Sequence, residues 1–115
     1  MHKVVLFPFN GEEMCFIHVL LNAKDMKSRG VDVKLVVEGA AVKLLPSLNE
    51  PDHPMHTLYA QVKEAGIIYG ACKACSTKLG VVEAIPACGI ALVGEMGGHP
   101  AMSEWIENGY QVVTF

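Results

Sequence analysis

Short apolar runs alternate with helix-like segments along this chain. The expected strands are 4–7, 31–37, 67–69, 89–93 and 110–115. The expected helices are 12–29, 57–65, 72–79 and 101–108. Alternation of strands and helices predicts a parallel sheet with helices on both faces. We therefore expect one domain over residues 1–115, a three-layer α/β/α sandwich of the flavodoxin or Rossmann type with a mainly parallel five-stranded sheet.

The segments that connect these strands and helices are expected to be short helices or loops. A short helix is expected to begin at Gly39 and to be limited by Pro46, because proline disrupts a helix interior. Residues 46–54 are polar and proline-bearing, which favours a loop. Residues 81–88 fit neither pattern clearly.

Composition favours self-association of the protein and disfavours nucleic acid and membrane as partners. Apolar residues make up 51% and charged residues 18%, so part of the apolar surface is expected to be buried between subunits of a homo-oligomer. The net charge of −3 argues against nucleic-acid binding. No apolar run approaches the roughly 20 residues that a membrane helix needs. The run Val4–Phe7 is followed at once by Pro8 and acidic residues, unlike an export signal, so a cytoplasmic location is expected.

The stretch from Ile67 to Cys75 carries the strongest chemical signal. A strand ends in small residues, and Cys72 follows in the expected first turn of a helix. A helix N-terminus has partial positive charge and favours a thiolate, and Lys73 adds a cation nearby. Cys72 is therefore predicted to be an accessible nucleophile or sulfur carrier.

Cys75 lies one helical turn after Cys72, in a C-x-x-C spacing. It could resolve a persulfide or sulfenic acid on Cys72 by forming a disulfide, or it could be a packed core thiol. The same spacing allows a zinc site completed by Cys88 and His99. Cys15, among apolar residues of the first helix, is interpreted as a packed thiol.

Other residues are expected at the same edge of the sheet, because the carboxyl ends of parallel strands lie together. Asn10 and Gly11 follow the first strand, and Asn10 could also cap the helix after it. Gly39 follows the second strand, and His99 follows the fourth. With Lys73, these residues form the candidate pocket around Cys72.

Several enzyme classes lack support in the sequence. There is no G-x-G-x-x-G after the first strand and no G-x-x-x-x-G-K-[ST] motif, so no nucleotide cofactor is expected. No catalytic triad or paired-carboxylate motif is present either. Any enzymatic activity is expected to be sulfur transfer at most.

Three segments in order resemble the DsrE/DsrF/DsrH-like family, which includes sulfur-relay proteins. They are Leu35–Val42, with its Gly-Ala-Ala-Val turn, Ala71–Ser76 followed by Gly80-Val81, and the closing Gly109–Phe115. The Cys-Lys-Ala-Cys form is most similar to the small stand-alone YchN-like members. Together the segments cover essentially the whole chain.

The resemblance implies flavodoxin-like subunits assembled as a homotrimer or homohexamer. It also implies that a cysteine carries persulfide sulfur between a donor and an acceptor protein, and that cysteine falls on Cys72. Cys75 is an additional thiol that relay subunits commonly lack. Two other functions remain open: a non-catalytic oligomeric module that binds a small ligand or protein, and a Cys/His metal-binding protein.

Overall fold

Five parallel strands form one sheet in the computed structural model, which describes residues 2–115. The strand order is β4-β3-β2-β1-β5, and every pair of neighbours is parallel. The strands are β1 (Lys3–Phe7), β2 (Asp32–Val37), β3 (Ile68–Cys72), β4 (Leu92–Val93) and β5 (Gln111–Thr114).

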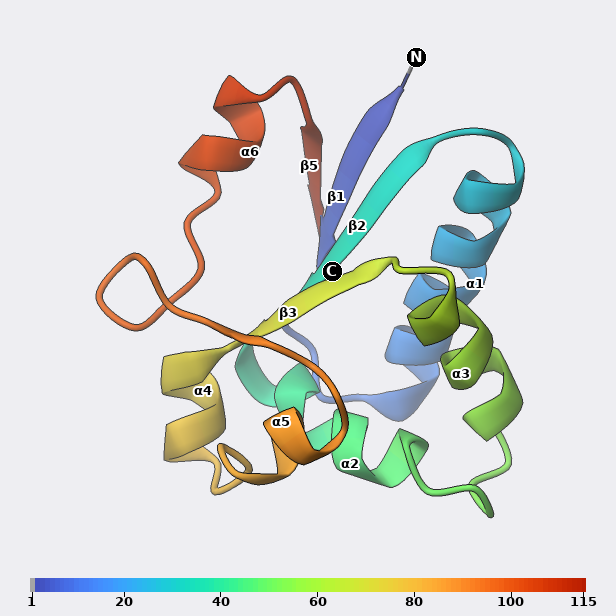
Figure 1. Ribbon diagram of the computed structural model, residues 1–115, viewed down its shortest axis with the longest axis vertical. Helices are drawn as coiled ribbons and strands as arrows, with labels where there is room; N and C mark the ends of the chain where they lie inside the picture. The colour runs from blue at the N-terminus through green and yellow to red at the C-terminus, as the bar shows by residue number, and fades with distance from the viewer. Residues whose placement is uncertain (1) are drawn as a thin grey trace.

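Helices lie on both faces of this sheet, as predicted. Figure 1 shows α1 and α3 on one side and α6 on the other. The helical segments are α1 (Glu13–Ser28), the 3-10 helix η1 (Gly39–Lys43), α2 (Leu44–Leu48), α3 (His56–Glu64), α4 (Lys73–Lys78), α5 (Ala84–Ala87) and α6 (Ser103–Glu107). The three-layer α/β/α prediction is confirmed, and the described sheet is wholly parallel.

The last three residues of β1 and of β2 are apolar and buried, because both faces of the sheet are covered there. Val5, Leu6 and Phe7 of β1 are fully buried. Successive side chains point to opposite faces, so Leu6 joins the large core beneath α1 and α3, whereas Val5 and Phe7 join a smaller cluster with Trp105. The face of the sheet beneath α6 is covered less completely than the other face. None of the five residues of α6 is fully buried.

The loop predicted for 46–54 begins later than expected. Pro46 lies inside α2, which continues directly from η1. It occupies the first turn of α2, where a missing N–H removes no hydrogen bond of that helix. Pro46 was predicted to limit the helix that begins at Gly39, and it lies instead near the start of α2.

The end of the third strand also differs from the prediction. β3 continues to Cys72, beyond the predicted end at Tyr69, because Ala71 and Cys72 pair with Leu92 and Val93 of β4. Cys72 is therefore the last residue of a strand, and α4 begins at Lys73.

No helix within residues 2–115 is long and apolar enough to cross a membrane.

Tyr59 provides a prediction about stability. Its side chain is fully buried, and its hydroxyl has no hydrogen-bond partner in the described part of the chain. Burial raises the pKa of Tyr59, so the folded protein resists ionisation of this phenol whereas the unfolded chain does not. The contribution of Tyr59 to stability is then fully present below pH 10, the ordinary value, and is lost as the pH rises above it.

Tyr59→Phe is expected to raise the free energy of unfolding by about 1 kcal/mol at neutral pH, because it removes a buried unpaired hydroxyl. It should also weaken the loss of stability above pH 10. Urea unfolding at pH 7 and at pH 10.5 measures both effects. A variant less stable than the parent at pH 7 would show that the hydroxyl makes a stabilising contact.

Candidate functional site

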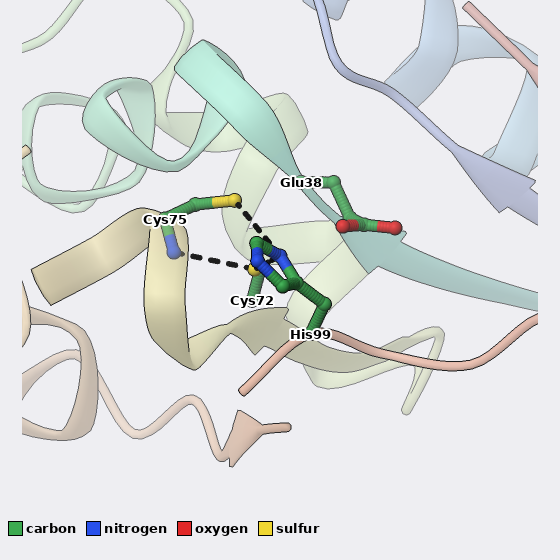
Figure 2. A group of neighbouring side chains, drawn as sticks. All are labelled: Glu38, Cys72, Cys75 and His99. Atoms are coloured by element: carbon green, nitrogen blue, oxygen red, sulfur yellow. Dashed lines mark hydrogen bonds between the residues drawn. The ribbon is translucent and has the colours of Figure 1, made fainter. Parts of the chain in front are cut away.

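Four side chains with sulfur, nitrogen or oxygen ligand atoms meet at the carboxyl edge of the sheet (Figure 2). They are Glu38, Cys72, Cys75 and His99, and one ligand atom from each lies within 4.8 Å of all the others. Glu38 follows β2, Cys72 ends β3, Cys75 lies in α4, and His99 comes from the loop after β4. The site is therefore assembled from four separate parts of the chain.

Cys72 joins a strand to a helix. Its Sγ accepts a hydrogen bond from the backbone N–H of Cys75 at 3.3 Å, so its side chain caps α4. Its carbonyl oxygen accepts a hydrogen bond from the Ser76 hydroxyl at 2.7 Å. Both bonds satisfy backbone groups at the strand-to-helix junction, and the bond from Cys75 also orients the Cys72 side chain.

The position of Cys75 follows from the start of α4. The backbone N–H of Ala74 donates to the carbonyl oxygen of Gly98 at 2.8 Å, which attaches the first turn of α4 to the loop that carries His99. The Sγ of Cys75 lies 3.9 Å from Nδ1 of His99. Cys75 is half-buried, so solvent reaches this residue.

His99 is positioned by a tight loop between β4 and α6. Met96 and His99 form a backbone bridge, and Gly97 and Gly98 between them both have positive φ. Glycine adopts such values without steric cost. Nδ1 of His99 lies 3.3 Å from Sγ of Cys72, while the imidazole itself is exposed.

Glu38 is the member of the cluster that the sequence analysis missed. Its side chain is only 6% exposed, and its backbone N–H donates to the carbonyl oxygen of Pro8 at 2.9 Å. Burial raises the pKa of Glu38, and the nearby His99 acts in the opposite direction. The available signal was its place directly after the apolar run of β2, at the same edge as Cys72.

The expected thiolate character of Cys72 is wrong for this structure. Cys72 is 0% exposed, and burial raises its pKa above the ordinary cysteine value, with a further increase from Cys75. The N–H of Cys75 acts in the opposite direction but does not dominate. Loss of solvation of the sulfur outweighs the favourable position before a six-residue helix.

The other predicted site residues lie outside the cluster. Lys73 is exposed at the start of α4. Asn10 does not cap α1 directly: its Oδ1 accepts a hydrogen bond from the backbone N–H of Glu12, the residue that precedes α1. Gly11 and Gly39 allow the loop after β1 to approach η1: a Cβ at Gly11 would meet Ala40 at 2.8 Å. Their role is close packing beneath the site.

Cys88 is also separate from the cluster. It is 6% exposed at the end of α5. Burial raises its pKa above the ordinary cysteine value, although the nearby Lys63 acts in the opposite direction. The predicted zinc ligands Cys72, Cys75 and His99 do come together, but Glu38 completes the group in place of Cys88.

A mainly apolar cavity of about 400 Å³ adjoins the cluster. Glu38 and His99 form its polar wall, and its other lining residues are Phe9, Met96, Pro100, Met102 and Ser103. A ligand or partner side chain in this cavity would meet the imidazole of His99 before it met Cys72.

Two archaeal proteins are similar to this chain in sequence. The chain is 29% identical over 97 residues to an uncharacterized protein of Methanocaldococcus jannaschii, covering 84% of this chain and 77% of that protein. It is 41% identical over 39 residues to an uncharacterized protein of Archaeoglobus fulgidus, covering 34% of this chain and 64% of that one.

A solved structure has the same fold. The conserved protein of unknown function BT1422 from Bacteroides thetaiotaomicron superposes with a TM-score of 0.73 at 24% identity, covering 98% of this chain and 94% of that one. The model of the DsrE/DsrF-like family matches residues 3–115. The chain therefore belongs to the DsrE/DsrF-like family.

Proposed function

We propose that this protein accepts sulfane sulfur as a persulfide on the Cys72–Cys75 pair and passes it to a second protein. Membership of the DsrE/DsrF-like family supports a role related to sulfur relay. The observation that carries the proposal is the position of His99, whose Nδ1 lies 3.3 Å from one thiol sulfur and 3.9 Å from the other. An imidazole in this position can take a proton from either thiol.

The two thiols differ in solvent accessibility, which supports a different role for each. Cys75 is half-buried, whereas Cys72 is completely buried and has a raised pKa. Attack on a sulfur donor requires an accessible thiolate. We therefore assign the accepting role to Cys75 and the resolving role to Cys72, the reverse of the order that the sequence suggested.

Sulfur moves from the donor to Cys75 and then to the acceptor. His99 takes the proton of the Cys75 thiol, and the thiolate attacks the outer sulfur of a donor persulfide. A sulfur–sulfur bond forms at Cys75 while the donor's sulfur–sulfur bond breaks, and the donor leaves as a thiolate. An acceptor thiolate then attacks the outer sulfur of Cys75 persulfide, which regenerates the Cys75 thiolate.

Cys72 provides a second outcome when no acceptor arrives. After His99 has released its first proton to solvent, it takes the proton of the Cys72 thiol. The Cys72 thiolate then attacks the inner sulfur of the Cys75 persulfide, the bond between the two persulfide sulfurs breaks, hydrosulfide leaves and a Cys72–Cys75 disulfide remains. A dithiol reductant restores the two thiols. The resolving role therefore limits how long sulfur stays on Cys75.

The test is mass spectrometry of the reduced protein after exposure to a small persulfide donor. One added sulfur, about 32 Da, is expected on Cys75. Cys75→Ser should abolish this adduct, and Cys72→Ser should retain it for longer because resolution is lost. Cys15→Ser is the matched control, because Cys15 is a half-buried thiol outside the cluster.

Other outcomes distinguish the alternatives. Loss of the adduct in Cys72→Ser, with retention in Cys75→Ser, would reverse the assigned roles and agree with the sequence-based prediction. An adduct in neither the parent nor the variants would overturn sulfur transfer and favour a non-catalytic binding module.

We also propose that the chain forms the homotrimer or homohexamer that the resemblance implies. Large apolar side chains are exposed on the side of the molecule that carries α6, and burial of such side chains between subunits would favour assembly. Tyr69 of β3 is 51% exposed and Ile106 of α6 is 62% exposed. Light scattering should give a trimeric or hexameric mass, and Tyr69→Glu should lower it. A monomeric mass for the parent protein would contradict the proposal.

A cytoplasmic site of action completes the proposal. Its support is that Cys15, Cys72, Cys75 and Cys88 are all free thiols. Reduced thiols persist in the cytoplasm, where glutathione and thioredoxin oppose disulfide formation. Fractionation of cells should find the protein with soluble cytoplasmic markers, and recovery with exported proteins would contradict this location.

A further inference from the structure

The candidate site has the composition and spacing of a metal centre. Two thiol sulfurs, one imidazole nitrogen and one carboxylate oxygen lie within 4.8 Å of one another. In a tetrahedral zinc site with ordinary bond lengths, sulfur and nitrogen ligands are about 3.6 Å apart. The distances from Nδ1 of His99 to the two sulfurs, 3.3 Å and 3.9 Å, lie on either side of this value.

We propose that Glu38, Cys72, Cys75 and His99 bind one Zn²⁺ ion with tetrahedral coordination. Thiolate and imidazole ligands favour zinc over magnesium or calcium, which prefer oxygen ligands. Four protein ligands would leave no position for substrate, so the site is of the closed, non-catalytic kind.

The surrounding structure holds the ligands in place before any ion arrives. The loop with Gly97 and Gly98 places Nδ1 of His99 beside both sulfurs. The N–H of Cys75 points to Sγ of Cys72, where it would stabilise negative charge on a bound thiolate. Glu38 and Cys72 are buried, which would protect the ion from exchange with solvent.

Charge and protons balance on binding. Zn²⁺ displaces one proton from each of the two thiols, and neutral His99 and ionised Glu38 complete the set. Three negative ligands and one dication leave a net charge of −1. Because both thiols are then occupied, zinc and sulfane sulfur would exclude each other, a consequence that rests on the proposed sulfur transfer.

The test is zinc titration of the full-length, reduced protein without oxygen, in competition with a chromophoric zinc chelator. One Zn²⁺ per chain is expected. Glu38→Gln and His99→Ala should each weaken binding at least about 10-fold, because even supporting residues around metal sites contribute that much. The matched controls are Glu64→Gln, which changes an exposed glutamate at the end of α3, and Cys15→Ser, and both should bind like the parent.

Cobalt substitution gives an independent readout. Co²⁺ in the parent protein should show intense tetrahedral absorption with thiolate charge-transfer bands, which Glu38→Gln alters and Glu64→Gln preserves. Circular dichroism confirms that each variant is folded. The proposal is overturned if the reduced parent binds less than stoichiometric zinc, or if Glu38→Gln and His99→Ala, both folded, retain the parent affinity.

The two proposals fail separately. A persulfide adduct on Cys75 without stoichiometric zinc would remove the metal site and leave sulfur transfer intact. Stoichiometric zinc without any adduct in the metal-free protein would remove sulfur transfer and leave the metal site.

Discussion

Cys75 of the native protein is expected to react with iodoacetamide at least about 100-fold faster than Cys72. Cys75 is half-buried, whereas Cys72 is 0% exposed beneath His99. Alkylation of a buried thiol requires local opening, and an opening free energy of about 3 kcal/mol lowers the reactive population by about 100-fold. Peptide mapping of samples quenched over time measures both rates.

Two comparisons separate burial from activation. In urea, the rates of Cys72 and Cys75 should converge, because the contrast comes from folded structure. In the native protein, Cys75 should also react faster than Cys15, a half-buried thiol that makes no hydrogen bond to a histidine within residues 2–115. Native labelling of Cys72 before Cys75 would contradict the accessibility on which the assignment of roles depends.

Gly39→Ala is expected to destabilise the protein by about 2–5 kcal/mol. Gly39 has φ +53°, a left-handed conformation that costs an L-residue roughly 1–2 kcal/mol. A Cβ at this position would also lie 2.8 Å from the carbonyl oxygen of Phe9. Backbone cannot move as easily as a side chain, so relief of this overlap adds about 1–3 kcal/mol.

Gly30→Ala is the matched control for this change. Gly30 has φ +84°, but a Cβ there would have no atom within 4 Å. Its expected cost is therefore the conformational term alone, about 1–2 kcal/mol. Urea unfolding of both variants measures the difference, which reports the close approach of the loop after β1 to η1. Equal stability of the two variants would show that the Phe9 contact relaxes without cost.

The fold followed from local patterns in the sequence. The apolar runs at 4–7 and 31–37 predicted two strands, and β1 and β2 form there. Alternation of strands and helices then implied a parallel sheet. Pro46 was misinterpreted because its effect depends on whether it occupies the first turn or the interior of a helix.

The site was determined only in part by the sequence. The C-x-x-C spacing placed two thiols one helical turn apart, and the position of His99 after a strand placed it at the correct edge. Tertiary structure brought Glu38 into the cluster and left Cys88 in the core. Such choices depend on contacts between distant segments, which spacing along the chain does not record.

Burial made the largest difference between expectation and structure. The sequence correctly placed Cys72 at a strand-to-helix junction, where a helix start favours negative charge on sulfur. The loop carrying His99 and the packing around β3 remove that sulfur from solvent, and loss of hydration opposes ionisation more strongly. The sequence thus determined which residues stand at the junction, and only the three-dimensional packing decided which thiol solvent can reach.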